Sequence, residues 1–337
     1  MRWKALALAM AGVALSTMAA MAQSAPEPAI KPAIVYDKGG KFDKSFNEGV
    51  FIGAEKFRTE TGIAFRDFEP NNDAQIEQAL RRFARDGHSP IVAVGFSQAT
   101  ALQKVAAEFP QLKFTIIDMV VELPNVQSVV FKEHEGSYLV GLLAAMASKS
   151  NKVGFVGGMD IPLIRKFACG YLQGVKAAKK DAEIFQNMTG STPAAWNDPV
   201  KGGELAKSQI DRGADVIYHA AGGTGIGVLR AVADAGKLGI GVDSNQNALQ
   251  PGRVLTSMLK RVDVAAYNSF AAAKNGTWQP GVSVLGLKED GIAWALDDNN
   301  KELITPEMKE AADKARAEII AGTVKVHDYM SDQKCTM

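Results

Sequence analysis

The sequence predicts an α/β protein in which two doubly wound parallel sheets face each other across a shared cleft. Short β-rich runs alternate with segments whose apolar residues recur every three or four positions. This rhythm is typical of parallel sheets that carry helices on both faces. It runs twice, and the second round begins near Lys152 without a visible sequence repeat. The 337 residues are enough for two such domains.

The predicted strands are short runs rich in apolar and β-branched residues. In chain order they are 33–36, 63–68, 91–95, 113–118, 128–131, 152–158, 183–188, 215–220 and 239–243. The segments with helical periodicity that lie between them include 73–87, 99–110, 135–149 and 201–214. Open α/β sheets bind ligands beyond the carboxyl ends of their strands, so we expect the ligand site there.

Residues 1–22 have the pattern of a secretory signal peptide. Arg2 and Lys4 precede the apolar stretch ALALAMAGVAL, and Ala20-Met21-Ala22 offers a cleavage site after Ala22. No cysteine lies near that site, so we expect a soluble periplasmic protein without a lipid anchor. The apolar runs are too short to span a bilayer, which predicts no direct insertion into the membrane.

The charge balance argues against nucleic acid or an anionic membrane surface as partner. Loss of Arg2 and Lys4 leaves 36 basic and 37 acidic residues, a net charge of −1. Both of those partners select clustered Lys and Arg side chains. The two cysteines, Cys169 and Cys335, are expected to pair in an oxidising compartment, although two unpaired thiols are the alternative. They cannot form a metal site or a redox motif, and we expect no cofactor.

Two loops resemble enzyme motifs without meeting their requirements. GFSQA, with Ser97 at its centre, matches a hydrolase nucleophile elbow, which needs a downstream acid and histidine on loops of the same sheet. The later histidines are His134, His219 and His327; His219 lies in a predicted strand of the second domain and His327 lies near the tail. We therefore expect Ser97 to cap the next helix or to hydrogen-bond a ligand. GGTGIG lacks the Gly-Lys-Ser/Thr of a phosphate-binding loop. It is either a plain turn or a place where backbone N–H groups meet a ligand oxygen.

The loops after the predicted strands hold many Gly, Asp, Asn and aromatic residues. This combination suits a neutral, polar ring compound better than an anion, which would call for several Arg or Lys side chains. In the first of these loops, Ser45 and Glu48 have the spacing of a helix capping box, so Phe46 would be the first helical residue. Phe46 either faces a ligand or belongs to a core stripe with Val50 and Phe57.

Four stretches in order resemble the basic membrane protein family of ABC-transporter substrate-binding proteins: DKSFNEG, KVGFVGGMDIPLIRKFACGYLQG, WNDPVKGGELAKSQIDRGADVIYHAAGGTG and IGVDSNQNALQPGRVLTSMLKRVD. The resemblance spans residues 30–327. It implies a type I periplasmic binding protein, with two Rossmann-like, doubly wound lobes joined by a three-segment hinge. It further implies a non-enzymatic, monomeric receptor that passes a small molecule, commonly a purine nucleoside, to an inner-membrane ABC permease.

The lobe boundaries follow from this expected architecture. We expect residues 30–130 and 243–275 in the first lobe and residues 131–242 and 276–330 in the second. Residues 331–337 would form a tail.

The resemblance also implies the residues that hold the base. Phe46 and Tyr218 would stack on its two faces, and Asn47 and Asp118 would hydrogen-bond its edge. The alternative for Asp118 is a turn or helix cap. Trp196 in WNDP could also be taken for a stacking residue, but we expect it to pack in its loop. Tyr218 departs from the phenylalanine often found in the family, and its hydroxyl needs a partner.

The same resemblance assigns the sugar contacts. Asp243 and Lys260 would bind the ribose hydroxyls, because a carboxylate accepts from vicinal hydroxyls while an ammonium donates to one of them. A plain inter-lobe salt bridge is the alternative. Asp37 would also contact the ligand, and Gly222 and Gly223 would let the backbone come close to the sugar.

Three rival functions remain open at this point. The first is a nucleoside hydrolase or esterase that uses Ser97. The second is a sensor that feeds a signalling partner. The third is a receptor for a free purine base, another heterocycle or a sugar.

Overall fold

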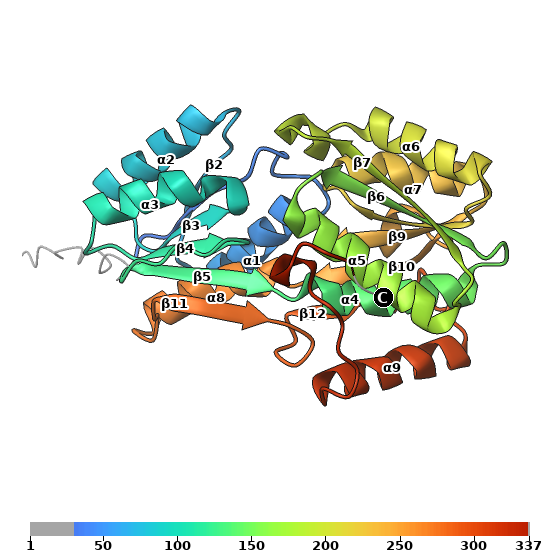
Figure 1. The fold of residues 1–337 in the computed structure, drawn as a ribbon. Coiled ribbons are helices and arrows are strands. Elements are labelled where there is room, and N and C mark those ends of the chain that lie inside the picture. The colour runs from blue at the N-terminus through green and yellow to red at the C-terminus, as the bar shows by residue number, and fades with distance from the viewer. Residues whose placement is uncertain (1–29, 336–337) are drawn as a thin grey trace, which may run out of the picture.

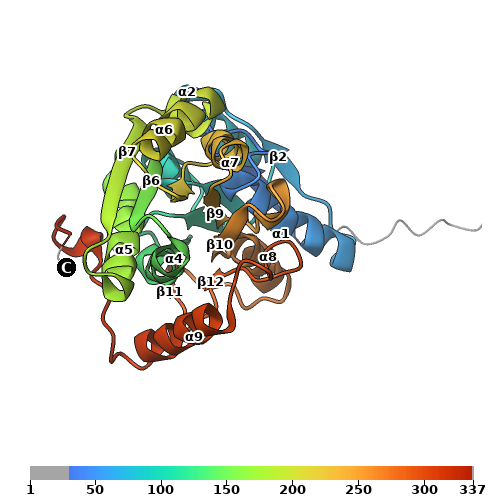
Figure 2. The ribbon, with the colours of Figure 1, turned by 90° about the vertical axis from the view of Figure 1, so that its right-hand side faces the viewer.

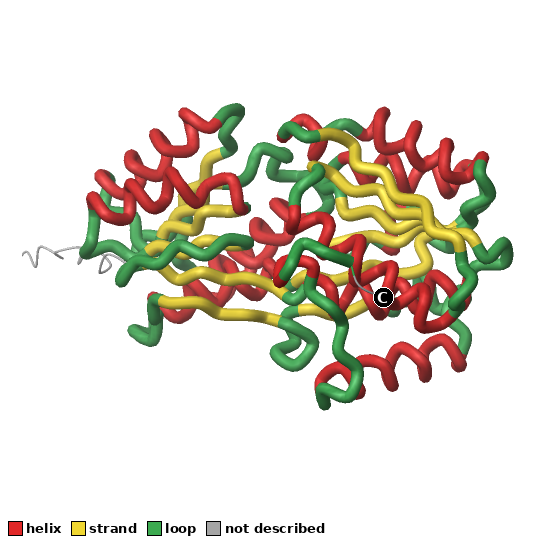
Figure 3. The backbone as a smooth tube through the Cα atoms, viewed as in Figure 1, coloured by secondary structure: helices red, strands yellow, loops and turns green. Residues whose placement is uncertain are grey.

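The computed structural model describes residues 30–335 and shows two lobes, each built on a six-stranded sheet (Figure 1). Each of the nine predicted strand runs overlaps a strand of the structure. The predicted α/β fold with two parallel-sheet lobes is confirmed. Figure 3 shows the two groups of strands with loops where the lobes meet. The predicted signal peptide lies outside the described residues.

The sheet of the first lobe is parallel throughout, in the order β11-β5-β4-β3-β1-β2. Its strands are β1 (Ala33–Val35), β2 (Arg66–Phe68), β3 (Ile91–Val94), β4 (Phe114–Ile117), β5 (Val126–Phe131) and β11 (Gly281–Leu285). The helices α2 (Asp73–Arg85) and α3 (Ala99–Glu108) cover one face, and α1 (Phe46–Thr61) and α8 (Val262–Lys274) cover the other (Figure 1).

The sheet of the second lobe has the order β12-β10-β9-β8-β6-β7, and β12 alone runs antiparallel to its neighbour. Its strands are β6 (Lys152–Met159), β7 (Glu183–Gly190), β8 (Val216–Ala220), β9 (Leu238–Asp243), β10 (Val254–Lys260) and β12 (Ile292–Trp294). Its helices are α4 (Glu133–Ala147) and α5 (Pro162–Ala178) on one face, α6 (Pro199–Asp211) and α7 (Thr224–Asp234) on the other, and α9 (Pro306–Ile320) outside α4.

The lobe boundaries differ from the predicted ones. Residues 243–275 were expected in the first lobe; α8 does pack there, but β10 pairs with β9 in the second lobe. Conversely, β11 was expected in the second lobe and pairs with β5 in the first. The pattern of β10 was hidden because Thr256 and Ser257 are polar yet fully buried, so its sequence does not read as an apolar run. Thr256 Oγ1 donates to the carbonyl of Ala295 at 2.7 Å, which satisfies its hydroxyl within the second lobe.

Three segments cross between the lobes side by side, after β5, after β10 and between β11 and β12. They are hydrogen-bonded to one another: Lys132 N donates to Leu285 O at 3.0 Å, and Arg261 N donates to Gly291 O at 2.9 Å. One apolar cluster continues through both lobes and includes Phe57 on α1 and Tyr171 on α5. The hinge therefore lies against a continuous core.

The C-terminal tail returns from α9 to α5 along the side of the second lobe (Figure 2). Cys169 on α5 and Cys335 form a disulfide, with Cα atoms 5.5 Å apart. Gln173 adds two hydrogen bonds to the backbone of His327, one to its N–H and one to its carbonyl. The tail is thus fixed to a helix that also reaches the cleft. Within residues 30–335, no helix is long and apolar enough to cross a membrane.

Candidate functional site

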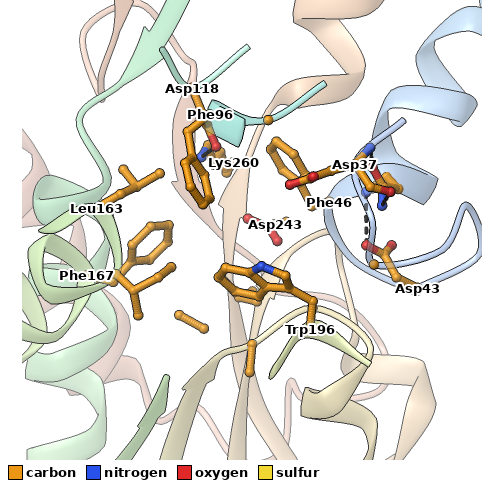
Figure 4. A pocket seen from close by; sticks show the side chains of 18 residues that line it. Asp37, Asp43, Phe46, Phe96, Asp118, Leu163, Phe167, Trp196, Asp243 and Lys260 are labelled. Carbon is orange, nitrogen blue, oxygen red and sulfur yellow. Dashed lines mark hydrogen bonds and ion pairs between the residues drawn. The ribbon is translucent and has the colours of Figure 1, made fainter. Parts of the chain in front are cut away.

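A cavity of about 580 Å³, counted to its open mouth, lies between the lobes at the carboxyl ends of the strands (Figure 4). Seven of the predicted ligand residues line it: Asp37, Phe46, Asn47, Asp118, Gly222, Asp243 and Lys260. Further lining side chains include Asp43, Phe96, Leu163, Ile164, Phe167 and Trp196.

Phe46 is placed by the start of α1. The carboxylate of Asp43 accepts hydrogen bonds from the backbone N–H groups of Ser45, Asn47 and Glu48 at 2.9–3.1 Å. This carboxylate, rather than the predicted Ser45 hydroxyl, satisfies the free donors of the helix start. Ser45 Oγ instead donates to Asp243 Oδ2 at 2.6 Å. The helix end is thereby tied to the second lobe, with Phe46 at the cavity.

Asn47 fixes the first loop. Its side-chain oxygen accepts from the N–H of Asp37 at 3.1 Å, and its side-chain nitrogen donates to the carbonyl of Gly40 at 3.0 Å. Asn47 is almost fully buried, and these bonds already use its amide. Asp37 in turn accepts a hydrogen bond from Ser97 Oγ at 2.8 Å. Ser97 does not line the cavity, and its described side-chain partner is a carboxylate rather than a histidine, which the hydrolase alternative needed.

Asp118 in the first lobe and Asp243 in the second lobe stand at the carboxyl ends of strands, and both have the same unusual backbone conformation. They have φ angles of 72° and 62°, in the left-handed region that residues other than glycine seldom adopt. Asp118 follows β4 and Asp243 is the last residue of β9. Both carboxylates reach the cavity (Figure 4). Asp118 Oδ1 is buried and has no hydrogen-bond partner among the described residues.

Lys260 is the cation among these acids. Its Nζ lies 2.6 Å from Asp118 Oδ2 and 2.9 Å from Glu133 Oε1, and the side chain is 2% exposed. Burial by itself would lower the pKa of Lys260, but Asp118, Glu133 and Asp243 outweigh it and raise the pKa above its ordinary value. Burial raises the pKa of Asp118 to about 6, with Lys260 opposing and Glu133 adding to the shift.

Aromatic rings form much of the remaining wall. Phe46 on α1 and Trp196 on the short 3₁₀ helix Pro193–Trp196 line the cavity from opposite lobes (Figure 4). Trp196 was expected to pack in its loop, and the structure instead gives it a face on the cavity. The ring of Trp196 lies against Gly158 on β6, where a Cβ would come within 2.1 Å of Cζ3. The absence of a side chain at Gly158 makes room for the indole.

Tyr218 does not line the cavity, which corrects its predicted stacking role. It is fully buried on β8, where its ring packs 5.5 Å from that of Phe155 and its hydroxyl lies 3.3 Å from Ser137 Oγ. Ala220 lines the cavity from the same face of the strand, two residues further on. Tyr218 therefore lies one pleat too deep to touch a ligand. Gly223 also lies outside the lining, whereas Gly222 belongs to it.

Several lining residues were not predicted. Phe96 directly follows a predicted strand, so its position alone could have indicated it. Leu163 and Phe167 stand one helical turn apart on α5 and face the cavity (Figure 4). Their spacing resembles that of any core stripe, so the sequence held no separate signal for them. Among residues 30–335, no group of three or more His, Cys, Asp or Glu side chains is arranged to hold a metal ion.

The comparisons with known proteins agree with this geometry. The model of the Bmp family, described as ABC transporter substrate-binding protein PnrA-like, matches residues 30–329. The ABC transporter nucleoside-binding protein BmpA of Lactococcus lactis is 32% identical over 320 residues, which cover 88% of this chain and 89% of that protein. An uncharacterized lipoprotein of Pyrococcus horikoshii is 35% identical over 281 residues, covering 80% and 69%.

A solved structure shows the same fold. The solute-binding protein of an ABC transporter system from Aeropyrum pernix superimposes with a TM-score of 0.81 and is 29% identical in sequence. The match covers 88% of this chain and 92% of that one. Both lobes are therefore shared with a protein of this transport class.

Proposed function

The chain belongs to the Bmp family of PnrA-like ABC transporter substrate-binding proteins, and we propose that its ligand is a purine nucleoside or a related heterocycle. Proteins of this family bind a small molecule for a permease and are not enzymes. In our proposal the protein works as a monomer in the periplasm. It captures the ligand between its lobes and delivers it to an inner-membrane permease.

The observation that carries the proposal is the pair of aromatic side chains on opposite lobes, Phe46 and Trp196. A flat heterocycle held between them gains a stacking contact from each lobe, on the order of 1 kcal/mol per face. Such a ligand favours the closed arrangement because it touches both lobes at once. In this proposal Trp196 provides the second stacking face, a role that the family resemblance had assigned to Tyr218.

The polar groups of the cavity suit the remaining parts of a nucleoside. Asp118 Oδ1 is a buried acceptor that has no hydrogen-bond partner within residues 30–335, so it can accept from the N–H groups of a base edge. Asp243 and Lys260 lie together on the cavity wall and provide an acceptor and a donor for ribose hydroxyls. Asn47, whose amide is already used within its loop, supports Phe46 rather than the base.

The charge of the lining favours a neutral ligand. Four carboxylates line the cavity, those of Asp37, Asp43, Asp118 and Asp243. Lys260 is the one basic residue among the described residues of the lining. Lys260 is already neutralised by Asp118 and Glu133. A phosphate group would meet carboxylates without a free cation to bind it. Nucleosides are therefore preferred over nucleotides in this proposal.

Mass spectrometry of small molecules released from protein that was purified without denaturation tests the proposal. Calorimetry then follows with the compound found and with a panel of purine and pyrimidine nucleosides, free bases, ribose and nucleoside monophosphates. We expect a purine nucleoside to bind more tightly than its free base and than its monophosphate. If no nucleoside and no purine binds, the proposal is wrong. Tighter binding of a free base or of ribose would change the ligand and keep the transport role.

A further inference from the structure

A row of five charged side chains with alternating sign leads from the cavity to the C-terminal tail. In order they are Asp118, Lys260, Glu133, Lys166 and Asp328, and the successive N···O distances are 2.6, 2.9, 2.9 and 3.5 Å. Glu133 occupies the middle of the row. Its Oε1 meets Lys260 and its Oε2 meets Lys166, and its side chain is 1% exposed.

These side chains divide unequally between the lobes. Lys260 ends β10, Glu133 begins α4 and Lys166 lies on α5, all in the second lobe, where α4 packs against both other elements. Asp118 follows β4 and alone comes from the first lobe. Lys260 and Glu133 also stand next to two of the crossing segments. Opening of the lobes would therefore separate Lys260 from Asp118 while leaving Glu133 in place.

A buried ammonium that loses its counter-ion is strongly unfavourable, so Lys260 needs a carboxylate that does not leave with the first lobe. Glu133 is the carboxylate in ion-pair contact with Lys260 that comes from the same lobe. Burial alone would raise the pKa of Glu133, but Lys260 and Lys166 outweigh it and lower the pKa to about 2. Lys166 supplies the second positive charge and is itself held by the carbonyl of Phe131 at 2.7 Å.

We propose that Glu133 is a positioning residue for the ligand site, which holds the Lys260 ammonium at the cavity wall in both the open and the closed arrangement. Lys166 is the counter-ion that keeps Glu133 ionised and in place. Closure then adds only Asp118 and the ligand to an ammonium that is already oriented, and less conformational freedom is lost on binding. The inference rests on the proposed function for the identity of the ligand, but not for the role of the row.

The first test uses Glu133→Gln, which keeps the shape of the side chain and removes its charge. Calorimetry compares a purine ribonucleoside with its 2′,3′-dideoxy counterpart, whose sugar lacks the two hydroxyls. In the wild type we expect at least a tenfold preference for the ribonucleoside. In Glu133→Gln we expect this preference to shrink at least threefold, because the ammonium is no longer aimed at the hydroxyls. A role in folding alone would lower stability and leave the preference unchanged, which would overturn the proposal.

Glu135→Gln is the matched control. Glu135 lies on the same turn of α4, is also buried, and accepts from Leu287 N at 2.9 Å, but has no contact with Lys260. We expect it to keep the wild-type preference. If Glu133→Gln does not fold, the double variant Glu133→Gln/Lys166→Gln restores the charge balance and should still show the reduced preference. An unchanged preference in the double variant would likewise contradict a positioning role.

A second readout needs no ligand. The ¹⁵N signal of the Lys260 ammonium, assigned by its loss in Lys260→Gln, reports whether the group is held in a fixed ion pair. In ligand-free protein we expect it to persist in Asp118→Asn and to disappear in Glu133→Gln. The reverse pattern would show that Asp118, not Glu133, holds the ammonium. This readout stays valid if no nucleoside binds to the wild type, so failure of the proposed function and failure of the inference give different results.

Discussion

Lys260 Nζ lies 2.6 Å from Asp118 Oδ2, and this ion pair joins the last residue of a strand in one lobe to the residue after a strand in the other. Both residues are nearly inaccessible to solvent through their side chains, at 2% and 7% exposure. Such a pair contributes little net stability because desolvation offsets most of its attraction. The pair matters because of its position: it connects the two lobes and forms only when they meet over the cavity.

Phe46→Ala should weaken binding of the natural ligand tenfold or more, about 1.4 kcal/mol, because it removes one stacking face. Calorimetry measures the change, and circular dichroism shows whether the fold is kept. Phe42→Ala is the matched control: Phe42 lies in the loop just before α1, is 62% exposed and does not line the cavity. An unchanged affinity for Phe46→Ala would mean that Phe46 is not a stacking face.

Gly158→Ala should reduce affinity without removing any side chain from the site. The new methyl group would lie 2.1 Å from the Trp196 ring and must displace the indole from its position. We expect a loss of at least tenfold, about 1.4 kcal/mol, by calorimetry. At Gly190, one strand away, a Cβ would meet Ala195 at an ordinary 3.7 Å. Equal affinities for the two alanine variants would argue against Trp196 as a ligand contact.

Tyr218→Phe should leave affinity within about twofold, or 0.4 kcal/mol, of the wild type. The phenol is buried behind the cavity wall and its hydroxyl contacts Ser137, so its removal affects packing and not the ligand. We expect a change in the free energy of unfolding of no more than about 1 kcal/mol. A tenfold change in ligand preference, seen by calorimetry with two nucleosides, would restore the direct role that the sequence suggested.

His219 should make the free energy of unfolding depend on pH. Burial lowers its pKa to about 4, and the hydrogen bond with Gln246 only partly opposes this shift. Because the folded pKa lies below the unfolded value of 6.5, the stabilisation is present above pH 6.5 and is lost as the pH falls through 4. Urea unfolding of the wild type and of His219→Gln should therefore show a stability gap that narrows over this range. A constant gap would mean that the folded imidazole titrates normally.

Cys335→Ser should lower the free energy of unfolding by about 2–4 kcal/mol, because the bond between Cys169 and Cys335 constrains a long loop in the unfolded chain. Urea unfolding measures the loss, and the wild type in reducing buffer should match the variant. Ser331→Ala, in the same tail, is the control for an effect of tail substitution itself. If reduction and Cys335→Ser both leave the unfolding curve unchanged, the disulfide does not form in solution.

Most of the fold could be predicted from the sequence, because the spacing of apolar residues follows which side chains are buried. All nine predicted strand runs overlap strands, and most of them present mainly apolar residues. Strands β10, β11 and β12 were not predicted. In β10 the residues Thr256, Ser257 and Lys260 are polar yet buried, and their polar groups are satisfied by partners distant in sequence. These partners come close only in the folded molecule, so a local sequence pattern cannot predict them.

The sequence predicted which loops form the site, but not which of their side chains line the cavity. The strand ends that hold Asp37, Asp118 and Asp243 follow from the alternation of strands and helices. The choice between Tyr218 and Trp196 depends on how deep a residue sits beneath the end of its strand, which a sequence pattern does not record. The capping of α1 illustrates the same limit, because Asp43 and Ser45 are both good capping residues and the contact of Ser45 with Asp243 decides between them.

The placement of β11 beside β5 has a consequence for how the molecule is made. Ser283 pairs with Val129, and α8 covers α1, so the first lobe lacks an edge strand and a covering helix until the chain has been produced well beyond the second lobe's main sheet. Contacts between such distant segments slow folding and leave apolar surface exposed in the meantime. Neither lobe can be released as a finished domain during synthesis. Each lobe completes its sheet only when residues 281–294 have been made, because β11 ends the sheet of the first lobe and β12 ends that of the second.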